Sequence, residues 1–167
     1  MTISARGGDA ARWEAFHGRF EREVEPAWRR RWLLALGAFE APEPMARSLA
    51  LLFGEGVPLQ DWASFASALF ANPAARAAAW SRLRAEWPAV TARLANAPML
   101  WRRVVEATGQ LTSRAELEGA RAFFAAQQVD PVKAAVAQTL ERLAEDVELA
   151  ERAGPELGRW LGGVGPA

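Results

Sequence analysis

Few side chains in this sequence have the types and spacing that catalysis or metal binding requires. His17 is the one histidine among 167 residues, and there is no cysteine. A histidine that acts as a general base needs a positioned partner, and the residues around His17 offer none. We therefore expect His17 to be structural or to lie at the surface. One histidine and no thiolate also exclude a multi-histidine or cysteine zinc site within this sequence.

Two pairs of glutamates are spaced four residues apart, Glu21 with Glu25 and Glu141 with Glu145. Paired carboxylates can perform acid–base catalysis. On an arginine-rich amphipathic helix the same spacing is typical of a solvated face, and we interpret both pairs in that way. The sequence also lacks H-E-x-x-H, G-x-S-x-G and the glycine motifs that bind nucleotides. We therefore predict no catalytic residue in this chain.

Two clusters of arginine are the candidate binding residues. One cluster lies between Trp28 and Trp32, and the other directly follows Trp101. Because the guanidinium fork binds carboxylates through two hydrogen bonds, each cluster could form an interface or face a peptide. A solvated face beside a buried seam of tryptophan is the alternative interpretation. The candidate residues are Arg29, Arg30, Arg31, Arg102 and Arg103.

The elements that position these side chains are predicted to be helices. Alanine, leucine, arginine and glutamate, with 37, 18, 19 and 16 residues, supply more than half of the chain. All four are strong helix formers. Valine, isoleucine and threonine together supply only 16 residues, too few for a sheet-rich fold. The composition therefore predicts an all-α protein.

Charge and hydropathy exclude further classes of protein. The 20 basic and 20 acidic side chains balance, whereas a general nucleic-acid binder needs a basic surplus. No apolar run approaches the roughly 18 residues of a membrane span. The first residues lack the order of a signal peptide. We expect neither a nucleic-acid nor a membrane partner, and a cytoplasmic location, although a preceding segment of a longer protein could carry a signal.

Apolar residues recur at helical spacing along most of the chain, in about nine segments joined by short breaks. Short connections predict antiparallel helix pairs, stacked as a HEAT- or armadillo-like α-α superhelix; a compact orthogonal bundle is the alternative. We expect a flexible N-terminus at 1–8, one helical-repeat domain at 9–161 and a flexible tail at 162–167. The expected helix starts are Glu25-Pro26, Asn72-Pro73, Ala97-Pro98, Asp130-Pro131 and a capping box at Ser113–Glu116.

Two prolines mark expected interruptions of helices. Trp87-Pro88 is expected to kink or split one helix, because proline removes a backbone donor and crowds the preceding turn. Gly154-Pro155 is expected to end the last long helix, with a short helix after it.

Five stretches match a known family in order and spacing, and the block that starts at Asn72-Pro73 is the most specific. They are Leu33–Phe39 (LLALGAF), Val57–Trp62 (VPLQDW), Asn72–Trp87 (NPAARAAAWSRLRAEW), Leu111–Phe124 (LTSRAELEGARAFF) and Gln138–Leu161 (QTLERLAEDVELAERAGPELGRWL). Over about residues 28–161 the sequence resembles the C-terminal helical domain of the aminopeptidase N family. These zinc aminopeptidases include the puromycin-sensitive and endoplasmic-reticulum enzymes.

This resemblance implies a HEAT-like superhelix that forms the distal part of the family's C-terminal domain. It implies a non-catalytic cap that covers the active-site cavity of a zinc-dependent aminopeptidase and influences peptide access. Zinc would be held by the catalytic domain of the same polypeptide, which would be the partner, together with peptide substrate. Pro58 and Ala71 stand where some members have a basic residue, so these positions cannot bind a peptide carboxylate.

A free-standing helical-repeat scaffold that binds another protein is the alternative function. Trp13, Phe16 and Phe20 lie on the first long helical segment and suggest that an outer partner is missing. This favours a domain cut from a larger enzyme, which we would expect to self-associate when isolated. An independent enzyme is a third reading, disfavoured by the lack of a polar cluster.

Overall fold

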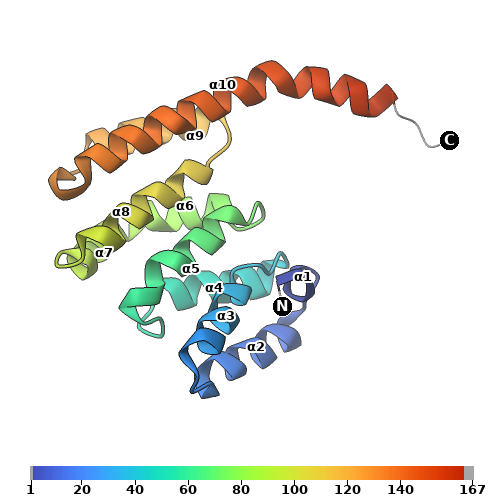
Figure 1. Cartoon of the computed structure of the whole chain (residues 1–167), viewed down its shortest axis with the longest axis vertical. Coiled ribbons are helices and arrows are strands. Elements are labelled where there is room, and N and C mark those ends of the chain that lie inside the picture. The colour runs from blue at the N-terminus through green and yellow to red at the C-terminus, as the bar shows by residue number, and fades with distance from the viewer. Residues whose placement is uncertain (1, 164–167) are drawn as a thin grey trace.

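The computed structural model describes residues 2–163 and is helical throughout (Figure 1). Ten α-helices and two short 3-10 helices follow one another, and no strand occurs in this range. The all-α prediction is confirmed. The helices are α1 (Thr2–Arg6), α2 (Ala10–Arg22), α3 (Pro26–Leu36), α4 (Pro42–Phe53), α5 (Leu59–Ala71), α6 (Arg76–Ala85), α7 (Trp87–Leu94), α8 (Pro98–Ala107), α9 (Arg114–Ala125) and α10 (Lys133–Gly163), with 3-10 turns at Thr108–Gln110 and Asp130–Val132.

The helices form a stack that runs from the N-terminal end to the C-terminal end of the chain (Figure 1). Helix α2 packs on α3, α3 on α5, and α5 on both α6 and α8. Helix α8 then contacts α10, which also packs along α9. Each helix is therefore covered mainly by helices near it in the sequence. The HEAT-like repeat itself stays a prediction.

Several helix ends follow from the local sequence. The capping box is confirmed: Ser113 Oγ accepts from the Glu116 backbone N–H at 3.3 Å, and Glu116 Oε2 accepts from the Ser113 N–H at 3.0 Å. The carboxylate of Glu25 caps α3 by accepting from the backbone N–H groups of Ala27 and Trp28. The split at Trp87-Pro88 is also confirmed, since α6 ends at Ala85 and α7 begins at Trp87.

An aromatic cluster joins the C-terminal half of the stack. The rings of Trp80 and Trp87, from α6 and α7, meet the ring of Phe123 on α9 edge to face, with centroids 5.3 and 5.4 Å apart. Phe124 and Trp101 complete the cluster. Edge-to-face pairs bury large apolar area in a defined geometry, so this cluster fixes four consecutive helices against one another.

The N-terminal end of the stack is covered by its own chain. Trp13 and Phe20 are 6% and 3% exposed, and the indole N–H of Trp13 donates to Ser48 Oγ on α4 at 2.8 Å. The expectation that this helix lacks an outer partner is therefore wrong for Trp13 and Phe20. Its apolar face packs on α3 and α4, which the sequence pattern of one helix could not show.

Residues 1–8 were expected to be flexible, which stays a prediction, and residues 2–6 of this segment form helix α1. Helix α1 packs on α3, and Ala5 is completely buried. A Cβ atom on Gly8 would lie 2.5 Å from Cε1 of Phe39, so glycine here permits close approach rather than freedom of the chain.

Helix α10 runs through Gly154-Pro155, so the predicted end at this position is wrong. Proline in a helix interior costs about 3 kcal/mol, and glycine about 1 kcal/mol relative to alanine. Proline nevertheless has a helical φ, and every residue from 148 to 160 is exposed, so water can bind the carbonyl of Glu151 that loses its donor. We call residues 148–163 the arm; it extends past the rest of the stack (Figure 1). The expected tail at 162–167 begins within α10, and residues 164–167 lie outside the described residues.

Candidate functional site

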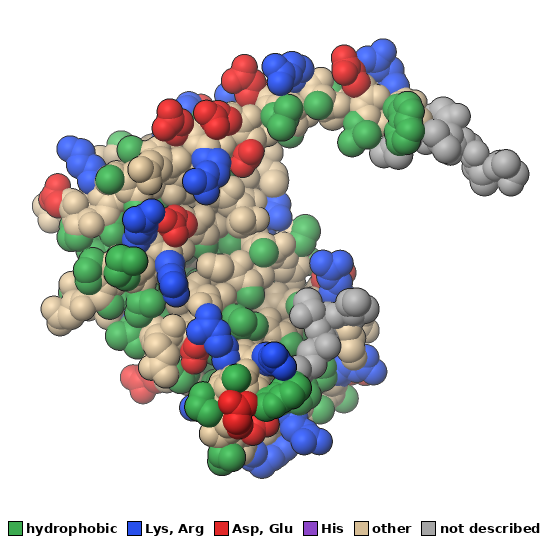
Figure 2. Space-filling view, in the orientation of Figure 1, with side chains coloured by type: hydrophobic (Ala, Val, Ile, Leu, Met, Phe, Trp, Pro, Cys, Tyr) green, Lys and Arg blue, Asp and Glu red, His purple; other side chains and the backbone are tan. Residues whose placement is uncertain are grey.

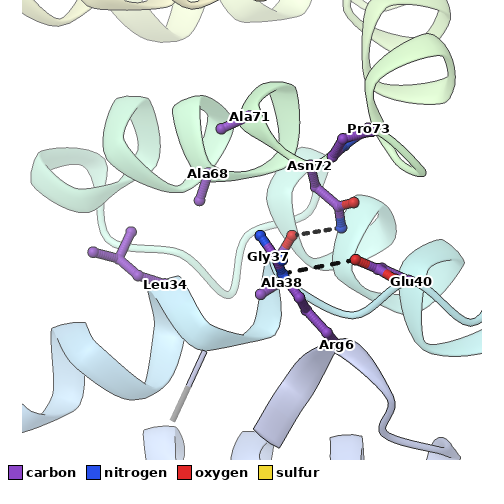
Figure 3. Close-up of a pocket in the computed structure, with 9 residues that line it drawn as sticks. All are labelled: Arg6, Leu34, Gly37, Ala38, Glu40, Ala68, Ala71, Asn72 and Pro73. Carbon is purple, nitrogen blue, oxygen red and sulfur yellow. Dashed lines mark hydrogen bonds and ion pairs between the residues drawn. The ribbon is translucent and has the colours of Figure 1, made fainter. Parts of the chain in front are cut away.

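A pocket of about 280 Å³ lies where the corner between α3 and α4 meets the corner between α5 and α6 (Figure 3). The side-chain amide of Asn72 holds the two corners together, because Nδ2 donates to the carbonyl oxygens of Gly37 and Phe39 at 3.0 and 2.8 Å. Its Oδ1 accepts from the Ala74 N–H at 3.0 Å. The pocket is lined by Arg6, Leu34, Gly37, Ala38, Glu40, Ala68, Ala71, Asn72 and Pro73.

The predicted helix start at Asn72-Pro73 is confirmed in part, since the regular helix begins three residues after Pro73. Asn72 ends α5, residues 73–75 form a turn, and α6 begins only at Arg76. Asparagine readily bonds to the backbone two residues on, and here the rest of its amide is taken by carbonyls more than 30 residues earlier. Asn72 therefore caps the turn that leads into α6, because its Oδ1 accepts from the Ala74 N–H and its backbone carbonyl accepts from the Arg76 N–H, and the same side chain also makes a tertiary contact.

The pocket offers one pair of opposite charges over an apolar floor. Arg6 Nε lies 3.7 Å from Glu40 Oε1, and both side chains are largely exposed. Ala68 and Ala71 form part of the floor, and a Cβ on Gly37 would lie 3.0 Å from Cβ of Ala68. This arrangement can hold a small group by shape and charge, and it provides neither a nucleophile nor a general base.

Two positions where relatives can carry a basic residue are now placed. Ala71 lines the pocket and brings no charge to it, so the positive charge there comes from Arg6 of α1 instead. Pro58 precedes the first residue of α5 and makes no side-chain cap. Arg6 was not among the predicted residues, because its surroundings depend on the packing of α1 against α3.

The arginines predicted at α3 are each engaged within the chain. The guanidinium of Arg29 lies 4.9 Å from the ring centre of Phe20, and Arg31 lies 4.6 Å from that of Trp28. Arg30 donates to Asp61 Oδ1 at 3.0 Å and to Ser64 Oγ at 2.7 Å, joining α3 to α5. The three side chains thus face separate partners and do not converge on one ligand.

The arginines predicted at α8 lie farther along the stack than those of α3 (Figure 1). Arg102 Nε donates to Glu106 Oε1 at 2.7 Å on the same helix, and Arg103 is exposed. The structure therefore does not join the two predicted clusters into one site. Their role as interface or peptide-facing residues stays a prediction.

A second groove, of about 630 Å³, runs between α9 and α10. Phe124, Val136 and Leu140 give it an apolar lining, and Arg121, Lys133 and Asp130 add charges of both signs. This groove was not predicted, because its walls come from two helices and no sequence motif indicates that these helices pack together. The one lysine of the chain was the only signal available.

Among the described residues, no group of three or more His, Cys, Asp or Glu side chains is placed to hold a metal ion. His17 stacks on Trp13 with ring centroids 4.8 Å apart, and its Nδ1 lies 3.8 Å from Glu21. Within residues 2–163, no helix combines the length and apolar character needed to cross a bilayer.

Two carboxylates have a lowered pKa, and both have structural roles. Burial alone raises the pKa of Glu116, but hydrogen bonds from Thr112 and Ser113, helped by the charge of Arg76, lower it overall. The hydrogen bond and charge of Arg114 lower the pKa of Glu151 and tie α9 to α10. Neither group lines the pocket of Figure 3.

Comparison with protein families places the chain in a family of helical domains. The model of the ERAP1-like C-terminal domain matches residues 1–145, which is most of the chain and leaves the arm outside. The comparison with curated proteins finds no match. The matched residues include four of the five stretches that carried the resemblance and the start of the fifth. The chain belongs to the family of ERAP1-like C-terminal domains, the helical C-terminal domains of aminopeptidases.

Proposed function

We propose that this chain acts as the non-catalytic cap of a zinc-dependent aminopeptidase, covering its active-site cavity and limiting which peptides enter. The family match over residues 1–145 carries this proposal. In such an enzyme the zinc ion would be held by the catalytic domain, and the chain itself would bind no cofactor. Its partners would be that catalytic domain and the peptide substrate, and its location would be cytoplasmic.

The physical case for a cap rests on rigidity. A lid that controls access must keep its shape while it contacts a moving substrate. Here the corner contact of Asn72 and the aromatic cluster at Trp80 and Trp87 tie successive helices together. The pocket of Figure 3 and the groove between α9 and α10 give such a cap two concave, partly charged surfaces.

The first test is the mass of the native protein in its source, measured with an antibody raised against this chain. The proposal expects a band several times heavier than 18.2 kDa. A second test incubates the purified chain with a chromogenic aminoacyl substrate, with and without zinc. No release is expected, and zinc-dependent turnover by the pure chain would overturn the proposal.

A free-standing interaction scaffold is the second candidate, and one observation favours it. The first long helix is covered by α3 and α4 of the same chain, so the start of the stack needs no partner to bury Trp13 and Phe20. A native band at 18.2 kDa would select this candidate.

A further inference from the structure

The arm carries an apolar face that no other part of the described chain covers. Leu149, Leu157 and Trp160 are 52%, 56% and 66% exposed, and Ala153 lies between them. Their spacing of three and four residues places them on one side of the helix. Figure 2 shows apolar side chains along the side of the arm that borders the hollow beside the stack, and charged ones on the opposite side.

The arm also has a sequence that does not favour a helix on its own. Gly154, Pro155, Gly158 and Gly162 are all inside it, and an added Cβ on any of the three glycines would meet nothing within 4 Å. Glycine and proline have the lowest helix propensities, and short isolated helices are marginal in water. A helix of this composition therefore needs packing along its apolar face.

The charges of the arm are arranged so that two copies of the arm can form ion pairs with each other. In the part of the chain that the structure describes, four charged residues of the arm make no ion pair, whereas Glu151 pairs with Arg114. These four are Glu148, Arg152, Glu156 and Arg159. If two arms lie antiparallel and cross near Ala153, Leu149 of each faces Leu157 of the other. The same register sets Glu148 beside Arg159 and Arg152 beside Glu156, and twofold symmetry makes each pair twice.

We infer that the arm is a dimerisation helix whose occupant is the arm of a second copy of this chain, lying antiparallel to it. The apolar faces pack together, and the small side chain of Ala153 lets the two backbones approach closely where the arms cross. The four charged residues fix the direction, because they lie on one flank of the apolar face: antiparallel packing sets these flanks of the two arms together, whereas parallel packing would set each flank against the uncharged flank of the other arm and leave the charges unpaired. This inference concerns the arm, outside the family match, and holds whether or not the proposed cap function does.

The oligomeric state of the full chain tests the inference. Light scattering should give a mass that rises from 18.2 kDa toward twice that value as the concentration increases. Trp160→Glu should weaken dimerisation, so that the dissociation constant of the dimer rises at least tenfold and the chain stays monomeric. Met99→Glu is the matched control, since Met99 is also 66% exposed but lies on α8, and it should leave the mass unchanged.

Single cysteines test the direction, since the chain has none of its own. Under mild oxidation Ala153→Cys should form a disulfide-linked dimer, because the two copies meet at this position. Ala122→Cys, on the exposed side of α9, is the control and should stay monomeric. Leu149→Cys mixed with Leu157→Cys should cross-link more than either variant alone.

Three results would overturn the inference. A mass of 18.2 kDa at every concentration would exclude the second copy as the occupant. Equal loss of the dimer in Trp160→Glu and Met99→Glu would place the contact elsewhere. Stronger self-linking of Leu149→Cys and Leu157→Cys than of their mixture would show parallel arms. Circular dichroism of each variant at low concentration separates these results from unfolding.

Discussion

The side-chain amide of Asn72 donates to the carbonyl oxygen of Phe39 at 2.8 Å, across 33 residues of sequence. A second N–H of the same amide group reaches the carbonyl oxygen of Gly37 at 3.0 Å. Asn72 is only 7% exposed, so water cannot readily replace these contacts. One side chain thereby joins the end of α5 to the end of α3 and shapes the pocket between them.

Asn72→Ala should lower the free energy of unfolding by about 2 to 3 kcal/mol, because two buried carbonyls lose their donors. Urea denaturation measures this loss. Asn72→Asp keeps the oxygen that accepts from Ala74 and removes the donors, so it should destabilise at least as much. Asn96→Ala, at an exposed asparagine, is the control. Wild-type stability of Asn72→Asp would contradict this account.

Ser48→Ala should lower the free energy of unfolding by about 2 kcal/mol. Ser48 is fully buried; its Oγ accepts from the indole of Trp13 at 2.8 Å and donates to the Leu36 carbonyl at 2.7 Å. Alanine leaves both partners unpaired. Thermal unfolding of Ser48→Ala beside the exposed control Ser81→Ala measures the difference, and equal melting temperatures for the two variants would show that the contact contributes nothing.

Trp62→Phe should lower the free energy of unfolding by about 1 kcal/mol more than Trp101→Phe does. The indole N–H of Trp62 donates to the Leu52 carbonyl at 2.6 Å, whereas that of Trp101 is buried and meets no acceptor among the described residues. Both changes remove similar ring volume from the core, so the difference isolates the hydrogen bond. Denaturant titrations of both variants decide the order, and the reverse order would refute it.

The stability of the chain should fall in acid partly through Glu116. Its pKa is lowered in the folded state, so its contribution is present above the ordinary value of 4.5 and is lost as the pH falls through the folded-state pKa. Glu116→Gln should lower the free energy of unfolding by about 0.5 kcal/mol at pH 7, the low end for a helix cap, because the carboxylate is only partly buried.

The pH series for this prediction compares the unfolding free energies of both proteins. The deficit of Glu116→Gln should shrink as the pH falls below 4.5 and disappear once the pH is below the lowered folded-state pKa, where the native carboxyl is protonated and resembles the amide. Glu118→Gln, which loses only a surface pair with Arg121, should show no such convergence. A deficit that stays constant with pH would mean that the charge of Glu116 is unimportant.

Local signals in the sequence predicted local structure well. The capping box at Ser113 acts within one turn, and the split before Pro88 follows from a missing donor, so neither depends on distant residues. The predicted starts at Glu25-Pro26 and Ala97-Pro98 match α3 and α8, because proline in the first turn acts locally. All-α composition then left no competing fold class.

Expectations failed where distant contacts decide the structure. Asn72-Pro73 was predicted only as a helix start, but the asparagine amide also binds carbonyls of the α3–α4 corner. Gly154-Pro155 has the residues of a helix stop, yet α10 continues. The pocket beside Arg6 could not be foreseen either, since it needs α1 in place. The predicted arginines were visible in sequence, but their separate partners were not.

The exposure of Trp160 has an optical consequence. The chain has eight tryptophans and no tyrosine, so its near-ultraviolet emission comes from indole alone. Trp62 and Trp87 are 1% and 3% exposed and emit from an apolar surrounding, while Trp160, at 66%, emits from water at longer wavelength. Whatever covers the arm will therefore move the emission of the native protein toward the blue. Binding to the arm can therefore be followed by the intrinsic tryptophan fluorescence of the protein, without an attached dye.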